Sequence, residues 1–209
     1  MRIAVLGATG GTGRSLTEQA IAAGHHVIAV VRDRQRLGDL VPSEVAIAEA
    51  GDADAMASAI RTADVVASCL GPRRDEPGSH VPVRGMLATL DAMRQAGVER
   101  LVTVSASGWV VDGDDPLTRY LAKPILRRVL RDPFADLAEM ERLVRASATR
   151  WTIMRPPMLV DRAPRGAYRS RRDGNVRWGF SIARGDLALA MLDAAVDPAA
   201  SRATISVAN

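Results

Sequence analysis

Residues 2–13 read Arg-Ile-Ala-Val-Leu-Gly-Ala-Thr-Gly-Gly-Thr-Gly, and they predict how the rest of the chain is organised. A short apolar run ends at a loop whose glycines lie three residues apart, and an alanine-rich helical pattern follows at once. A buried strand that leads into a helix in this way presents unpaired backbone N–H groups and the positive end of the helix dipole to an anion. The stretch therefore predicts a phosphate-binding loop between a first strand and a first helix.

The glycines of this loop have distinct roles in the prediction. Gly7 permits the tight turn, Gly10 lets a pyrophosphate approach the backbone, and Gly13 lets the helix pack closely on the strand. We expect the phosphate contacts to come from Gly7, Thr9, Gly10, Gly11, Thr12 and Gly13. The alternative is a strand-to-helix turn that binds no ligand.

Alternating strand and helix patterns continue along the chain. Strands are expected at 3–6, 27–31, 45–48, 64–70, 101–104, 151–154 and 204–207, and helices at 15–23, 54–61, 84–96, 121–130, 133–146 and 186–195. We also expect a hairpin in which residues 166–172 and 176–181 pair around a turn at 173–175. The pattern predicts the α/β class, with a Rossmann-like, doubly wound parallel sheet and helices on both faces, formed by residues 1–209 as a single domain.

The composition fits a cytoplasmic protein that binds small molecules, as a monomer or homodimer. Hydrophobic residues make up 47% and charged residues 25% of the chain, which are ordinary globular values. No apolar run approaches the ~20 residues of a membrane span, and Met1 leads into the first strand with no signal peptide. The single cysteine fits a reducing compartment, and no cluster of residues predicts a metal site. The net charge of +4 comes from basic and acidic residues that alternate along the chain, which argues against nucleic-acid binding.

Arg32 bears on the choice of cofactor, because it follows the second strand. An NAD site carries Asp or Glu at this place, about 20 residues beyond the glycine loop, to hold the ribose 2′-hydroxyl. Arginine suits the 2′-phosphate of NADP through charge-assisted hydrogen bonds. We therefore expect NADP(H) to be preferred over NAD(H), and the alternative is a solvated turn.

The carboxyl ends of the other strands add candidate cofactor contacts, because ligands of open α/β sheets bind at that edge. Asp52 caps a helix or faces the adenine together with its neighbour. Ser105 is placed to hydrogen-bond a nicotinamide or a substrate carbonyl. The tandem prolines after the sixth strand fix an extended wall that can press on a flat ring. The full set at these strand ends is Asp52, Ala53, Cys69, Leu70, Gly71, Ser105, Pro156 and Pro157.

The substrate region is expected in the loops of residues 72–84, 105–135 and 155–182. Arg73 is placed to attract an anionic substrate, although surface display is the alternative for an arginine in a loop. Trp109 can stack on an acceptor ring or serve in packing. Met158 follows the proline pair and is the third candidate for a substrate contact.

These residues together resemble a known family. The chain is similar to the atypical short-chain dehydrogenases/reductases with an NAD(P)H-binding, NmrA-like domain, and most of all to their flavin reductase (biliverdin-IXβ reductase) branch. The matching motifs are residues 2–13, Val31-Arg32-Asp33, Gly51-Asp52, Leu70-Gly71, Val104-Ser105 and Met154-Arg155-Pro156-Pro157. The resemblance implies NADPH as hydride donor and flat acceptors such as flavins, with flavin as substrate and not as prosthetic group.

The catalytic groups depart from the commoner pattern of short-chain dehydrogenases, in which a lysine assists a tyrosine in a Tyr-x-x-x-Lys pair. Tyr120 and Lys123 are one residue too close, and Pro124 occupies the expected lysine position. Met158 stands where the flavin reductase branch has a histidine. We therefore expect catalysis by proximity with Ser105 as the catalytic residue. The alternatives are an NADP(H)-binding redox sensor without turnover and a nucleotide-dependent isomerase or epimerase.

Overall fold

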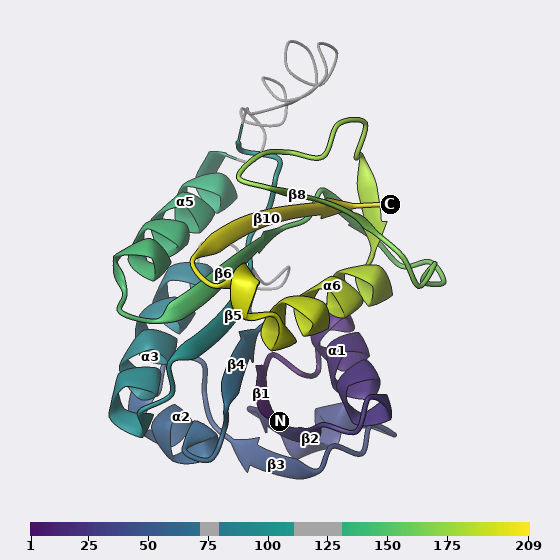
Figure 1. The fold of residues 1–209 in the computed structure, drawn as a ribbon. Helices are drawn as coiled ribbons and strands as arrows, with labels where there is room; N and C mark the ends of the chain where they lie inside the picture. Colours follow the sequence, from purple (N-terminus) through teal and green to yellow (C-terminus); the bar gives the residue numbers. More distant parts are fainter. Residues whose placement is uncertain (72–79, 111–130) are drawn as a thin grey trace.

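The structure, a computed structural model, describes residues 1–71, 80–110 and 131–209, and an eight-stranded sheet forms its centre (Figure 1). The strand order is β3-β2-β1-β4-β5-β6-β10-β8. All neighbours are parallel except β10 and β8, which run antiparallel at one edge. The strands are β1 (Arg2–Leu6), β2 (His26–Val31), β3 (Glu44–Ile47), β4 (Val65–Ser68), β5 (Arg100–Val104), β6 (Arg150–Arg155), β8 (Arg169–Arg172) and β10 (Ala203–Ala208).

Helices cover both faces of this sheet, which confirms the predicted doubly wound architecture. Helices α1 (Gly11–Ala22) and α6 (Arg184–Val196) pack on each other over one face. Helices α2 (Ala53–Ile60), α3 (Val81–Ala96) and α5 (Arg131–Ala146) form a row over the other (Figure 1). Two short 3-10 helices, η1 (Arg34–Leu37) and η3 (Pro198–Ala200), complete the helical elements of the described residues.

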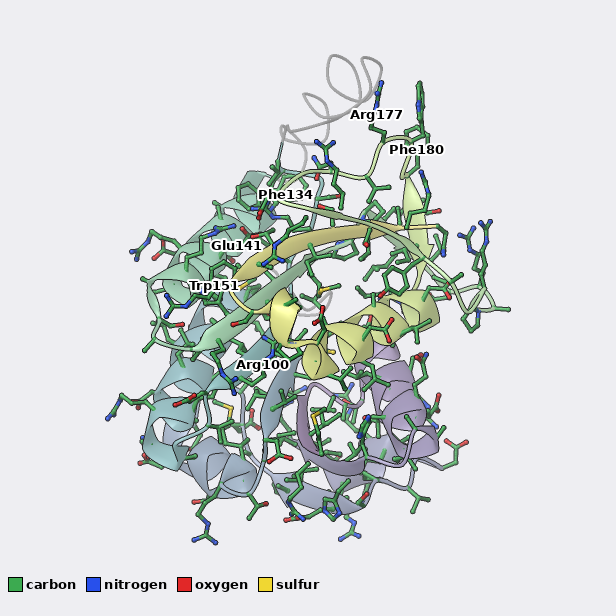
Figure 2. All side chains as sticks on the ribbon, viewed as in Figure 1. Arg100, Phe134, Glu141, Trp151, Arg177 and Phe180 are labelled. Atoms are coloured by element: carbon green, nitrogen blue, oxygen red, sulfur yellow. The ribbon has the colours of Figure 1, made fainter. Side chains whose placement is uncertain are left out.

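The core has two halves because the strands alternate their side chains between the faces. In β1, Ile3 and Val5 join the cluster under α1 and α6, whereas Ala4 and Leu6 join the cluster under α2, α3 and α5. Burial on both faces explains why the central strands are continuous apolar runs. Arg100 is a buried exception (Figure 2). Its guanidinium donates to the carbonyl oxygens of Arg150 and Ala194, at 2.5 Å each, and so ties β5 to β6 and to the last turn of α6.

The predicted hairpin at residues 166–181 is wrong. β8 pairs antiparallel with β10, and Ser181–Ala183 (β9) pairs in parallel with Met158–Val160 (β7) in a separate two-stranded sheet. A turn is present at Asp173, which has a left-handed backbone, but the chain then diverges from β8, and Asn175 donates to the carbonyl oxygen of Val110 at 2.8 Å. The local turn signal was correct and the strand pairing was not.

Two helices begin three or more residues earlier than predicted. Helix α1 begins at Gly11, four residues earlier than expected, because the glycines of the loop adopt helical geometry. Helix α3 begins at Val81 with Pro82 in its first turn, where proline lacks only an N–H that has no partner in any case. The helix expected at residues 121–130 lies outside the described residues.

Candidate functional site

The glycine loop joins β1 to α1 and leaves the first turn of α1 open to an anion. Gly7 has a φ of +77°, and a Cβ on it would lie 3.1 Å from the carbonyl oxygen of Cys69. A Cβ on Gly13 would collide with the carbonyl group of Gly7, so the helix packs as closely on the turn as predicted. The residue before the helix, Gly10, provides no side-chain cap, and the first turn carries no acidic residue. The N–H groups of that turn are therefore available for phosphate.

The pocket beside this loop contains several of the predicted cofactor residues. It is lined by residues from the loop, from the carboxyl ends of β2 and β3, and by Leu70: Leu6, Gly7, Thr9, Val30, Val31, Arg32, Ala48, Ala50, Met56 and Leu70. Its volume of about 60 Å³ is far below the ~300–1,000 Å³ of a typical ligand pocket. It can therefore receive one end of a ligand whose remainder extends along the edge of the sheet.

Arg32 lies at the rim of this pocket with an exposed side chain, and no carboxylate in the described residues pairs with it. The acidic residue that follows Arg32 is engaged elsewhere. Asp33 accepts a hydrogen bond from the backbone N–H of Gln35 at 2.8 Å and caps η1. Within the described residues, the guanidinium of Arg32 is thus available to a phosphate at the end of β2.

Asp52 caps α2, which is the simpler of its two predicted roles. Its carboxylate accepts from the backbone N–H of Ala55 at 3.0 Å. Ala53 is the first residue of α2 and packs against the core beneath that helix. Contact of these two residues with adenine stays a prediction.

Cys69 follows β4 and is held within the protein. Its Sγ lies 3.9 Å from Sδ of Met191 on α6, and its backbone N–H donates to Leu6. Burial raises the pKa of the Cys69 thiol to about 12. The thiol is therefore protonated at neutral pH and makes a poor nucleophile. Leu70 and Gly71 continue toward the pocket, and Leu70 packs against Gly85 of α3.

Ser105 is buried at the carboxyl end of β5, with only 6% of its surface exposed. Its backbone N–H donates to the carbonyl oxygen of Met154 at 2.8 Å, which fixes it beside the end of β6. Its hydroxyl has no hydrogen-bond partner in the part of the chain that the structure describes. A buried polar group of this kind requires an explanation, and a ligand that completes its hydrogen bond is one.

The two prolines continue β6 past Ser105. Pro156 is buried, and its carbonyl oxygen accepts from the N–H of Ser107 at 2.8 Å. Pro157 is half-buried, and Met158 is 66% exposed as the first residue of β7. The structure therefore places Ser105, at the end of β5, beside the segment of Pro156, Pro157 and Met158 that follows β6.

Trp109 serves mainly in packing. It is half-buried against the core under α2, α3 and α5, and the guanidinium carbon of Arg155 lies 5.1 Å from its ring centroid. That distance is typical of a cation–π contact. Arg155 thus covers one face of the ring that was predicted to stack on an acceptor. The third substrate candidate, Arg73, lies outside the described residues.

A buried acidic residue supports Arg155 and was missed by the sequence analysis. Glu141 on α5 is fully buried, and both of its oxygens accept from Arg155, at 2.9 and 2.5 Å (Figure 2). Arg145 also donates to Glu141 at 2.6 Å. In the sequence, the only indication was a glutamate on the apolar side of an amphipathic helix, and nothing there predicted its partner. The cluster links α5 to the residue that precedes the prolines.

No tyrosine–lysine pair exists in the described residues. Tyr120 and Lys123 lie outside them, and the other tyrosine, Tyr168, donates to Asp193 at 2.7 Å. Burial, together with this carboxylate, raises the pKa of Tyr168. Its phenol is therefore held protonated and already donates its proton to a protein carboxylate.

Two further features near the candidate site were not predicted. The side chain of Arg184, the first residue of α6, lies across Gly11. Trp178 and Phe180 are both more than half exposed, with ring centroids 6.3 Å apart in an edge-to-face arrangement. Figure 2 shows Phe180 projecting away from the body of the sheet. None of the helices within the described ranges is both long and apolar enough to cross a bilayer.

Comparisons with known proteins agree with this geometry. A family model described as NAD(P)H-binding matches residues 7–198. The chain is 26% identical to the uncharacterized protein YwnB of Bacillus subtilis, over 92% of this chain and 91% of that protein. It is 32% identical to a 3-diazoavenalumate denitrifying reductase of a Streptomyces species, over 74% of this chain. That alignment covers 55% of the reductase, so the chain spans about half the length of this relative.

Solved structures share the fold over the whole chain. ChuY, an anaerobillin reductase from Escherichia coli O157:H7, superposes with a TM-score of 0.81 at 22% identity, covering 100% of this chain and 94% of ChuY. A short-chain dehydrogenase/reductase from Veillonella parvula in complex with NADP superposes with a TM-score of 0.79 at 19% identity, with the same coverage of 100% and 94%. At these identities the likeness concerns the fold.

Proposed function

We propose, from the premise that this chain belongs to the NAD(P)H-binding family, that it is an NADPH-dependent reductase. Its acceptor in this proposal is a flat molecule such as a flavin, a quinone or a related carbonyl compound, and a flavin is bound as substrate. The Streptomyces relative is a reductase, and the structural neighbour ChuY is described as one. These likenesses support reductase chemistry in general, and the acceptor is inferred from the site.

The buried hydroxyl of Ser105, which has no partner among the described residues, is the observation that carries the proposal. It lies at the same edge of the sheet as the glycine loop, where a dinucleotide laid across the strand ends brings its nicotinamide. The proline segment stands beside it. A hydroxyl and a rigid apolar wall are the elements required to orient two flat rings face to face.

Arg32 supports the preference for NADPH. Its guanidinium is free of carboxylate partners in the described residues, and it lies at the rim of the pocket beside the loop. A charge-assisted contact with the 2′-phosphate strengthens NADPH binding and leaves NADH binding largely unaffected. The Veillonella structure with NADP shows that a protein of this fold accepts this dinucleotide.

The protein's contribution to the chemistry is positioning. Reduced nicotinamide supplies the hydride when the cofactor is bound. The hydroxyl of Ser105 donates to the nicotinamide amide or to the acceptor carbonyl, and the proline wall limits the movement of the rings. Tyr168 already donates to Asp193, so among the described tyrosines none is free to supply the remaining proton of a reduced acceptor.

The acceptor is expected in the loops of residues 72–84, 105–135 and 155–182. Within the described parts of these loops, Met158 and the aromatic pair Trp178 and Phe180 expose apolar surface. Met158 pairs with Ser181, which directly follows Phe180, so the aromatic pair leads into the strand that lies beside Met158. An apolar, aromatic surface of this kind fits a flat ring system.

NADPH oxidation by the pure protein, with and without FMN and with NADH in parallel, tests the proposal. We expect FMN-dependent turnover that prefers NADPH. Ser105→Ala should lower turnover and leave NADPH affinity nearly unchanged. Arg32→Ala should weaken NADPH binding far more than NADH binding, and equal losses for the two cofactors would exclude the 2′-phosphate assignment.

A redox sensor that binds NADP(H) without turnover is the second candidate. The lack of a tyrosine–lysine pair in the described residues favours it. Tight NADPH binding with no oxidation by FMN or a quinone would support the sensor over the reductase. Gly10→Val tests both, because a side chain there blocks the approach of a pyrophosphate, and tight binding by this variant would show that the loop is not the phosphate site.

A further inference from the structure

Arg184 lies directly against the phosphate-binding turn, although it is 171 positions beyond the last glycine of the loop, Gly13. A Cβ built on Gly11 would lie 2.6 Å from Cδ of Arg184 and 3.1 Å from its Nε. Only a residue without a side chain at position 11 admits this contact. The stem of Arg184 therefore crosses the first turn of α1, and its guanidinium lies beside that turn.

The segments around Arg184 are held in place by well-formed contacts. Gln19 of α1 donates to the carbonyl oxygen of Gly185 at 2.8 Å, which joins the start of α6 to α1. The fully buried carboxylate of Asp186 accepts from the backbone N–H groups of Arg165 and Gly166, at 3.0 and 2.9 Å. The start of α6 and the loop before it thus form a fixed support for the Arg184 side chain.

The guanidinium itself is only partly engaged. Its Nε donates to Asp161 at 2.6 Å, and the Asp161 side chain is 82% exposed. The two terminal nitrogens donate to no group within residues 1–71, 80–110 and 131–209. Asp161 therefore orients the planar group through one edge and leaves the fork of N–H donors free.

Asp161 offsets the charge of Arg184, and the helix turn beneath the guanidinium adds further positive charge. The N-terminus of a helix carries a partial positive charge, and a neighbouring arginine adds to it. The first turn of α1 contains no acidic residue, and its N-cap, Gly10, has no side chain to offset that charge. A bound phosphate would accept from the backbone N–H groups on one side and from an arginine fork on the other.

We propose that Arg184 binds the pyrophosphate of the dinucleotide and completes the phosphate site that the glycine loop begins. The inference depends on dinucleotide binding, which the family membership supplies, and not on turnover of any acceptor. In this proposal Arg32 binds the 2′-phosphate and Arg184 binds the pyrophosphate.

The test compares two variants of Arg184 with a matched control. Arg184→Met keeps an aliphatic stem over Gly11 and removes the charge, and Arg184→Lys keeps the charge without the fork. Arg162→Met is the control, because Arg162 belongs to the same loop region as Asp161 and, within the described residues, donates to Asn209 alone, at 3.0 Å. Dissociation constants for NADPH and for adenosine 2′-monophosphate, which lacks a pyrophosphate, are measured by calorimetry at two salt concentrations.

We expect Arg184→Met to weaken NADPH binding about 10- to 100-fold, as for a lost hydrogen bond to a charged group. Arg184→Lys should fall between this variant and the wild type, and Arg162→Met should match the wild type. Adenosine 2′-monophosphate should bind all four proteins alike. The salt dependence of NADPH binding should also decrease in Arg184→Met, because one cation no longer contacts the ligand.

Two outcomes would overturn the proposal. One is NADPH binding by Arg184→Met that equals that of Arg162→Met. The other is an equal loss for NADPH and adenosine 2′-monophosphate, which would assign Arg184 a structural role through Asp161. Thermal unfolding of each variant identifies a folding defect. If Arg184→Met has such a defect, the NADPH affinity of Arg184→Lys decides between the proposal and a structural role. Failure of the reductase proposal shows separately, as NADPH binding by the wild type without oxidation by an acceptor.

Discussion

Replacing Glu141 with glutamine should destabilise the protein far more than the same change two residues earlier. Glu141 is fully buried and accepts two hydrogen bonds from Arg155, whose side chain is 11% exposed. Glu139 lies on the same helix and also accepts two hydrogen bonds, from Arg142, but that pair is largely exposed, at 44% and 65%. Both substitutions remove a carboxylate that accepts two hydrogen bonds from one arginine, and they differ in burial. Glu141 also accepts from Arg145, whose side chain is 39% exposed.

The magnitude follows from the charge that is left behind. Glu141→Gln keeps the volume of the side chain and leaves the Arg155 guanidinium without its counter-charge in a site almost closed to water. Breaking a buried ion pair on one side costs about 3–5 kcal/mol. For a chain of 150–250 residues each kcal/mol lowers the melting temperature by about 2–4 °C, so a decrease on the order of 10 °C is expected. Water screens the exposed pair, so Glu139→Gln should leave the melting temperature nearly unchanged.

Urea unfolding followed by tryptophan fluorescence and thermal unfolding followed by circular dichroism measure both effects. Trp109 contacts Arg155 and adds a local signal at the cluster. The double variant Glu141→Leu with Arg155→Met removes both charges and should recover much of the lost stability. If Glu141→Gln and Glu139→Gln unfold at the same urea concentration, the reasoning from burial is refuted.

Three further predictions concern the glycine loop and its neighbours. Gly13→Ala should destabilise the protein by about 1–3 kcal/mol and weaken NADPH binding, because the added Cβ collides with Gly7; an unchanged urea midpoint and an unchanged dissociation constant would contradict this. The Cys69 thiol should react with Ellman's reagent much more slowly in the native protein than in urea at about pH 8. Because its folded pKa of about 12 lies above the ordinary value near 9, stability should also decline as pH rises from 9 toward 12 in the wild type and less in Cys69→Ala. Asp52→Ala should cost about 1 kcal/mol through loss of the α2 cap, and a stability equal to that of wild type in urea would show that the cap is dispensable.

The features that the sequence predicted well are those carried by neighbouring residues. The turn at Gly7, the close approach at Gly13 and the cap at Asp52 each depend on a few adjacent positions. The parallel sheet follows from the alternation of short apolar strands with amphipathic helices. These signals are local, and the structure agrees with them.

The features that the sequence did not predict depend on pairing across long distances. Whether residues 169–172 pair with 176–181 or with β10 is decided by packing against the rest of the sheet, and the turn residues carry no information about it. The sequence does not mark Arg155 and Glu141 as partners, nor Arg184 and Gly11, because only the fold places them in contact. Among nearly thirty basic residues in the chain, no pattern marks these arginines as different from those in solvent.

The contact of α6 with α1 has a consequence for the order in which the protein acquires its binding ability. The glycine loop leaves the ribosome long before the helix that packs beside it, because that helix begins at Arg184. During synthesis the β1–α1 unit therefore keeps one apolar side exposed until α6 has emerged. A nascent chain that has not yet released α6 lacks this support and, with it, the arginine at the phosphate turn. Mutations in α6 can thus impair a motif that lies more than 160 positions before it, through delayed closure of this contact.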